Sequence, residues 1–190
     1  MKKNNRGFTL VELLAVSAVM VVVSVIVTAT ITSSLRGTTK TNTINDVRQN
    51  GNYAIAQVSK MIEYAKSFNG VSNDNVAFVS NCVDSTPPLT PTPTPSQYKY
   101  IAITGFDNGQ TIFGCSQNNV NTIASNSAFL IDTSLVSVDA CSFTCERARI
   151  TDPPIIGINF SLSKNTTSSL FENKASISFK TSVKMRNLSN

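Results

Sequence analysis

One acidic residue, Glu12, lies at the start of a long apolar segment, and its position carries the clearest chemistry in this sequence. No charged residue occurs from Leu13 to Leu35. As a helix, this segment would be roughly 35 Å long, enough to span a hydrocarbon core of about 30 Å. A carboxylate near the edge of that span costs on the order of 2–3 kcal/mol unless an opposite charge meets it. The segment supplies no such charge, so we expect the partner to be a cation created elsewhere.

The residues around Glu12 indicate where that cation arises. The sequence Arg6-Gly7-Phe8-Thr9-Leu10-Val11-Glu12-Leu13 resembles the cleavage site of type IV prepilins, whose basic leader is removed after the glycine by a membrane aspartic peptidase. The resemblance implies cleavage between Gly7 and Phe8, N-methylation of Phe8, and a role for Glu12 in setting register during filament assembly. In that role the Glu12 carboxylate would meet the Phe8 amine of a neighbouring subunit. Such a pair removes the desolvation penalty that each charge carries alone.

Two other interpretations of the N-terminus remain open. The segment could be a simple membrane anchor with Glu12 near the headgroups, or a secretory signal peptide cleaved after Val27-Thr28-Ala29. A signal peptide has an apolar core of about 7–15 residues, shorter than the run seen here. The prepilin interpretation predicts a mature chain that begins at Phe8, whereas the signal-peptide interpretation predicts Thr30.

The chain contains four cysteines, all beyond the apolar segment: Cys82, Cys115, Cys141 and Cys145. The basic leader favours a cytoplasmic N-terminus, which places the cysteines outside the cytoplasm, where disulfides persist. Cys141 and Cys145 could close a small loop, with Cys82 to Cys115 as a longer link, but the sequence does not choose among three connectivities. A four-thiolate zinc site and free thiols are alternatives. The lack of a Cys-x-x-Cys pair favours disulfides and no metal.

Other chemistry is scarce. The chain has no histidine, which excludes histidine-dependent triads and His-Glu-x-x-His zinc sites. No glycine-rich phosphate-binding motif occurs, and the acidic residues are dispersed. The net charge of +5 includes three basic leader residues, and the others are scattered, so nucleic-acid binding is not indicated. We expect no enzymatic activity and no cofactor.

The periodicity predicts an α+β fold in which a long N-terminal helix packs on an antiparallel β-sheet head. We expect a leader over residues 1–7, a membrane-spanning and assembly helix over 8–35, and an amphipathic continuation over 36–68 that stops near Asn69-Gly70. The expected apolar face of the continuation recurs every three or four residues: Ile44, Val47, Gly51, Ala54, Val58, Met61, Ala65 and Phe68.

Residues 69–190 read as a β-rich head. Runs at 98–103 and 110–113 flank the turn Phe106-Asp107-Asn108-Gly109 and predict a hairpin. Alternating apolar residues at 156–162 and 175–185 predict a second antiparallel pair. Shorter strands are expected at 128–131 and 135–138. The Pro/Thr-rich segment 85–96 is expected to form an extended loop.

The resemblance also bears on the kind of subunit. Many major pilins carry a helix-kinking proline at the position of Ala29, whereas no proline precedes Pro87 here. Residues 36–68 and 179–187 loosely resemble J-type pseudopilins of type II secretion and PilW-type minor pilins. A minor pilin or pseudopilin is therefore favoured over a major pilin. A membrane-anchored binding protein or adhesin is the alternative from another class.

The resemblance further implies partners and a location. The partners would be a prepilin peptidase and methylase, other pilin or pseudopilin subunits, and the inner-membrane platform of the assembly machine. The chain would cross the inner membrane once, with its head outside the cytoplasm, before it enters a filament in the periplasm or on the cell surface.

Overall fold

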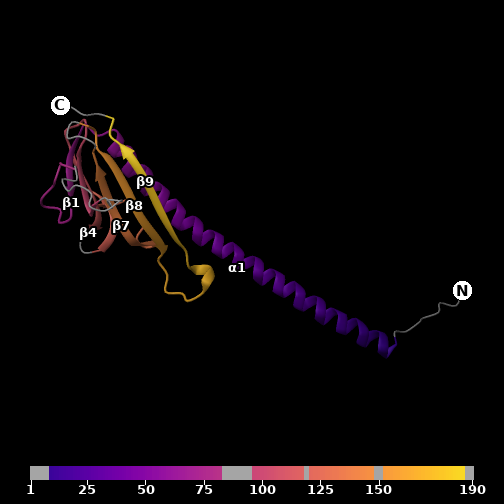
Figure 1. The fold of residues 1–190 in the computed structure, drawn as a ribbon. Helices are drawn as coiled ribbons and strands as arrows, with labels where there is room; N and C mark the ends of the chain where they lie inside the picture. Colours follow the sequence, from indigo (N-terminus) through magenta and orange to yellow (C-terminus); the bar gives the residue numbers. More distant parts are fainter. Residues whose placement is uncertain (1–8, 83–95, 118–119, 148–151, 187–190) are drawn as a thin grey trace, which may run out of the picture.

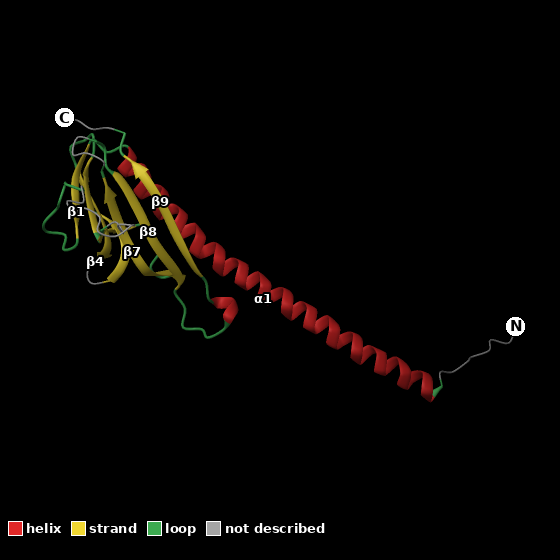
Figure 2. Ribbon diagram, viewed as in Figure 1, coloured by secondary structure: helices red, strands yellow, loops and turns green. Residues whose placement is uncertain are grey.

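A computed structural model describes residues 9–82, 96–117, 120–147 and 152–186. One long helix leads into a head made of strands, as Figures 1 and 2 show. In chain order the elements are α1 (Leu10–Glu63), β1 (Ser67–Ser72), β2 (Gln97–Tyr98), β3 (Tyr100–Thr104), β4 (Gln110–Gln117), β5 (Val120–Ser125), β6 (Ala128–Phe129), β7 (Val136–Glu146), β8 (Ile155–Lys164), the 3-10 helix η1 (Phe171–Asn173) and β9 (Ser176–Lys184).

Helix α1 is 54 residues long and continuous, which corresponds to about 80 Å. It ends at Glu63, so the predicted end near Phe68 and the stop at Asn69-Gly70 are wrong. Residues Ser67–Ser72 form β1 instead, which pairs with β3. Gly70 has a φ of 142° within β1, and a Cβ there would lie 2.8 Å from the Val79 carbonyl carbon. This glycine therefore permits a close approach of two chain segments rather than a helix cap.

The second half of α1 buries one narrow stripe against the head. Most of the expected face is buried, namely Val47, Gly51, Ala54 and Val58 within α1 and Ala65 just beyond its end. Met61 is 38% exposed, whereas Ile62 is fully buried in its place. A helix of 3.6 residues per turn drifts relative to any fixed spacing, and this drift shifts the stripe by one residue near the helix end.

The predicted α+β fold, with a long N-terminal helix packed on an antiparallel head, is confirmed. The head contains two sheets, with strand orders β1-β3-β4-β5-β6 and β2-β7-β8-β9. The predicted hairpin forms from β3 and β4, with Asn108 at a positive φ in its turn. Strands β8 and β9 form the second predicted pair and lie along α1 (Figure 1).

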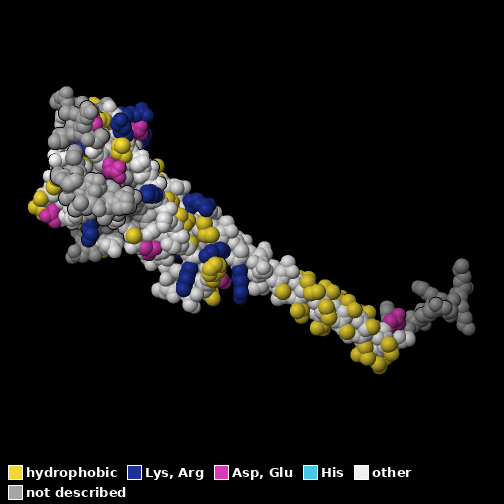
Figure 3. Space-filling model, in the orientation of Figure 1, with side chains coloured by type: hydrophobic (Ala, Val, Ile, Leu, Met, Phe, Trp, Pro, Cys, Tyr) yellow, Lys and Arg dark blue, Asp and Glu magenta, His cyan; other side chains and the backbone are white. Residues whose placement is uncertain are grey.

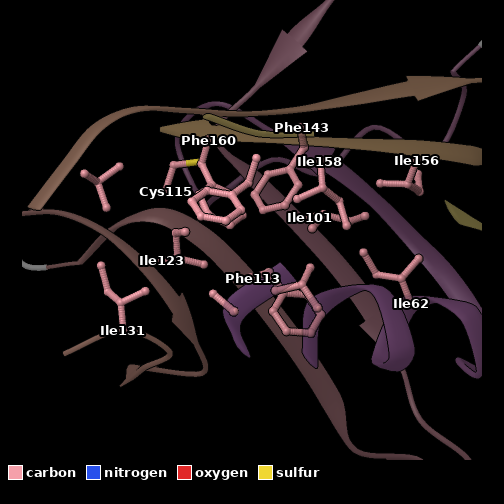
Figure 4. Packing of buried hydrophobic residues seen from close by; sticks show 14 of the residues in the cluster. Ile62, Ile101, Phe113, Cys115, Ile123, Ile131, Phe143, Ile156, Ile158 and Phe160 are labelled. Atoms are coloured by element: carbon pink, nitrogen blue, oxygen red, sulfur yellow. The ribbon is translucent and has the colours of Figure 1, made fainter. Parts of the chain in front are cut away.

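The core fills the space among the two sheets and α1, as the close view in Figure 4 shows. Phe113 comes from the first sheet, Phe143 and Ile158 come from the second, and Ile62 comes from α1; all four are buried. Phe179 of β9 lies directly over Gly51, where an added Cβ would meet its ring at 2.1 Å. The helix thus approaches the sheet closely at a residue without a side chain.

The four cysteines form two disulfides, Cys82–Cys145 and Cys115–Cys141, with Cα–Cα distances of 5.4 and 5.5 Å. This pairing overturns the Cys141–Cys145 and Cys82–Cys115 arrangement considered from the sequence. Cys141 and Cys145 both lie in β7, and residues four apart on a strand are about 13 Å apart, too far for a disulfide. The Cys115–Cys141 bond instead joins β4 of one sheet to β7 of the other.

Candidate assembly site

The structure places Glu12 in the first turn of α1. Gly7 and Phe8, the expected cleavage and methylation residues, lie outside the described residues, as does most of the Pro/Thr-rich segment 85–96. The cysteines belong to the head, at the other end of the molecule from Glu12 (Figure 1). The sequence-derived candidates therefore do not form one site. Glu12 lies at the start of the helix, and the disulfides lie in the head.

Glu12 and Thr9 form a capping box at the start of α1. The Glu12 backbone N–H donates to Thr9 Oγ1 at 3.3 Å, and Glu12 Oε2 accepts from the Thr9 backbone N–H at 3.4 Å. Such reciprocal bonds satisfy two donors that a helix N-terminus leaves without partners. The carboxylate also lies at the end of the helix where the macrodipole favours negative charge. The Thr-x-x-Glu spacing was visible in the sequence, and our sequence reasoning missed it.

The first part of α1 exposes its apolar side chains on every side. We call residues 10–35 the apolar half of α1. Its large apolar residues from Leu10 to Leu35 are between 49% and 77% exposed. Figure 3 shows them as a continuous apolar surface that extends away from the head. A surface of this extent is typical of a segment that lipid or protein must cover.

Five hydroxyl groups of the apolar half donate to backbone carbonyl oxygens of the same helix. Ser24, Thr28, Thr30 and Thr32 each donate to the carbonyl oxygen four residues earlier, over 2.7–2.9 Å. Ser17 donates in the same way to Leu14, three residues earlier. These bonds hide polar groups that would otherwise be costly in an apolar environment. The segment can therefore act as an apolar element despite its serines and threonines.

Three ion pairs, each partly exposed, join the rest of α1 to the head. Arg36 lies 3.8 Å from Glu172, Lys164 lies 2.7 Å from Asp46, and Arg186 lies 2.6 Å from Glu63. Each pair joins the helix to β8, β9 or their connections. With the buried stripe, they orient the head relative to the helix axis. The exposed apolar half therefore extends from the head in a defined direction.

The head also contains local carboxylate networks. The Ser72 hydroxyl and the backbone N–H groups of Val76 and Ala77 donate to Asp74 and lower its pKa to about 2. Ser134 lowers the pKa of Asp132 in the same way. Both groups organise turns. In the described part of the chain, no three His, Cys, Asp or Glu side chains gather where they could hold a metal ion.

Comparison with known families identifies the N-terminus. Residues 2–28 match the prokaryotic N-terminal methylation motif. Comparisons with curated proteins and with solved structures found no match for the chain. Among the described residues one helix, α1, is long and apolar enough to cross a membrane, and its apolar window is entirely unburied. The motif and the fold together support a type IV prepilin-like protein with a pilin-like α+β structure.

The motif supports a structural, pilin-like subunit, and it implies processing by a prepilin peptidase and assembly with other pilins. The apolar helix and the motif also fit membrane anchoring.

Proposed function

We propose that this chain is a minor pilin or pseudopilin, a subunit that is processed in the membrane and then built into a filament through α1. The observation that carries the proposal is the apolar half of α1, which is unburied in the single chain and lies largely within the match to the methylation motif at residues 2–28. Lipid covers this surface before assembly, and the same helices of neighbouring subunits cover it afterwards. A lone subunit offers no other cover for it among the described residues.

Processing creates the charge that Glu12 needs. Cleavage between Gly7 and Phe8 releases an amine at Phe8, which is then methylated. The bonds from Thr9 to the Glu12 carboxylate are long, at 3.4 Å, so this carboxylate can accept a stronger partner. In the filament that partner is the Phe8 amine of the adjacent subunit. The pair sets axial register because it forms at one offset between two helices.

One feature supports a minor subunit over a major one. The helix contains no proline, and α1 is unbroken from Leu10 to Glu63. We place the chain in the inner membrane with a single span and the head outside the cytoplasm, where disulfides persist. Its assembly partners are other pilin subunits and the membrane platform of the machine.

The decisive experiment separates charge pairing from helix capping. Glu12→Gln keeps a side chain that can complete the capping box but removes the charge. Thr9→Val removes the capping hydroxyl but keeps the Glu12 carboxylate. We expect Glu12→Gln and Glu12→Ala to abolish recovery of the chain in sheared filaments. We expect Thr9→Val to assemble close to the normal level.

Mass analysis of the N-terminal peptide completes the test. All three variants should begin with methylated Phe8, which shows that they reached the membrane and were processed. Normal assembly of Glu12→Ala would reject the register role of Glu12. Unchanged surface display of a chain that never enters sheared filaments would favour the alternative of an anchored binding protein. A mature chain that begins at Thr30 would show that the segment is a signal peptide instead.

A further inference from the structure

The connection between β8 and β9, residues 165–175, carries two exposed apolar side chains. Leu170 is 54% exposed and Phe171 is 76% exposed, in a segment otherwise rich in Asn, Ser and Thr. Its short helix η1 packs against α1. The connection projects from the end of the head that lies nearer the apolar half of α1 (Figures 1 and 2). Single exposed apolar residues are common on proteins. A binding role for this pair must therefore be argued from its position.

Contacts with α1 define the position of this connection along the helix axis. Arg36, the first charged residue after Leu35, lies 3.8 Å from Glu172. The Lys40 ammonium lies 4.0 Å from the centre of the Phe171 ring and donates to the carbonyl oxygens of Phe171 and Lys174. Leu35 and Lys40 are separated by about 8 Å along the helix axis. That rise is close to the thickness of one headgroup layer, about 5–8 Å.

The two apolar side chains are held outward by hydrogen bonds within the connection. The Ser168 backbone N–H donates to Thr166 Oγ1 at 3.1 Å. Ser168 Oγ in turn accepts from the Leu170 backbone N–H at 3.2 Å and from Asn173 Nδ2 at 3.0 Å. These bonds give the connection a defined shape, and Asn165 at its base donates to the carbonyl oxygens of Leu135 and Thr133. Leu170 and Phe171 are therefore displayed by an ordered scaffold.

The charge around the pair is mostly positive. Arg36 lies beside Glu172 of η1, the Lys40 ammonium lies over the Phe171 ring, and Lys174 is exposed at the end of η1. Aromatic and basic side chains at the end of an apolar span are typical of the membrane–water interface. There, the ring lies among headgroups and the cations meet lipid phosphates. The length of the apolar half, the position of the Phe171 ring and the local positive charge all place this connection at the membrane–water interface.

We propose that residues 165–175 form an interfacial anchor that inserts Leu170 and Phe171 among the lipid headgroups on the side of the membrane that the head occupies. Arg36, Lys40 and Lys174 then bind lipid phosphate groups. The anchor rests on the proposed function in one respect, because it requires α1 to span a membrane. It adds a second membrane contact that fixes the tilt and rotation of the head before assembly. Entry into a filament breaks this contact.

The absence of tryptophan from the chain allows a direct test. Phe171→Trp places a fluorescent reporter in the anchor. The matched control is Phe106→Trp in the β3–β4 turn, because Phe106 is also well exposed, at 66%. This turn lies near the C-terminal end of α1, since Lys66 donates to Asn108. Both full-length variants are reconstituted into vesicles of phosphatidylethanolamine and phosphatidylglycerol that contain a lipid brominated close to its headgroup.

We expect brominated lipid to reduce the emission of the Phe171→Trp variant roughly twofold and to shift its maximum to shorter wavelength. The Phe106→Trp variant should show neither change. Adding Arg36→Gln and Lys40→Gln to Phe171→Trp should weaken the quenching.

Three outcomes would overturn the anchor. Equal emission with and without brominated lipid, in chains that float with the vesicles, would reject it and leave the proposed membrane-spanning helix intact. A blue shift seen only in assembled filaments would assign the surface to a neighbouring subunit. Failure of the full chain to float with vesicles would reject the anchor and the proposed membrane span together.

Discussion

The two halves of α1 belong to one continuous helix, yet they differ in composition and in what covers their apolar side chains. In the apolar half, residues 10–35, apolar side chains surround the helix and are exposed. In residues 36–63, which we call the packed half, a single stripe is apolar and lies against the head. The halves differ in both composition and pattern: 18 of the 26 residues from 10 to 35 are apolar, but only 9 of the 28 from 36 to 63 are, and these include the apolar residues of the stripe. A helix that is apolar on all sides requires a surrounding apolar medium, whereas a striped helix requires one neighbouring surface.

The sharpest test of this contrast removes the same group from each half. Ile62 is fully buried, and Ile26 is 60% exposed. We expect Ile62→Ala to lower the free energy of unfolding of the head by about 2–5 kcal/mol, because it leaves a cavity in the core. Ile26→Ala should change it by less than about 0.5 kcal/mol. Thermal unfolding of both full-length variants in the same detergent measures the difference, and equal losses would contradict the division of the helix.

The second test concerns the cross-link between the two sheets. Cys115 and Cys141 are separated by 26 residues in the chain, and their disulfide joins β4 to β7. Replacing both with serine should reduce the free energy of unfolding by about 3 kcal/mol, mainly because the unfolded chain gains freedom. Helix content in detergent should remain unchanged, because the apolar half contains no cysteine. A thiol count on the unfolded, unreduced protein provides the control, with no free thiol expected before substitution.

The third test compares two glycines of the same helix. A Cβ at Gly51 would meet the Phe179 ring, which is itself stacked on Phe160 and has little room to move. We expect Gly51→Ala to destabilise the head by about 1–3 kcal/mol through overpacking. Gly37 has no atom within 4 Å of the added Cβ, so Gly37→Ala should stabilise the helix by up to about 1 kcal/mol. Denaturant unfolding checks the opposite signs, and a stabilising Gly51→Ala would contradict the close helix–sheet contact.

These features also show which information the sequence contained. The apolar half, the β3–β4 hairpin and the β8–β9 pair were predictable, because each depends on residues close together in the chain. The capping box at Thr9 and Glu12 was equally local and was overlooked.

Other features depend on distant parts of the chain. The disulfide pairing follows from which strands become neighbours, so the short spacing of Cys141 and Cys145 was misleading. Phe68 continued the helical spacing but lies in β1, because its segment pairs with β3, a strand more than thirty residues later. The rotation of α1 about its own axis, relative to the sheet, decides whether Met61 or Ile62 is buried. Neither distinction is encoded in local periodicity.

The smallest expected effect concerns pH, because titratable groups are present in the head and absent from most of the apolar half of α1. No titratable side chain occurs from Leu13 to Leu35, whereas the head holds Asp74 with its pKa lowered from 3.8 to about 2. Because folding favours the ionised form, this carboxylate stabilises the head above about pH 4. That contribution is lost as the pH falls toward 2.

Ser72→Ala removes the strongest donor to Asp74 and should raise its pKa toward 3.8, as an NMR titration of the carboxyl carbon would measure. Asp74→Asn should reduce the dependence of head stability on pH between about 4 and 2 while the helicity of the apolar half stays constant. An unchanged Asp74 pKa in Ser72→Ala would mean that the backbone N–H groups of Val76 and Ala77 alone hold the carboxylate in its ionised form.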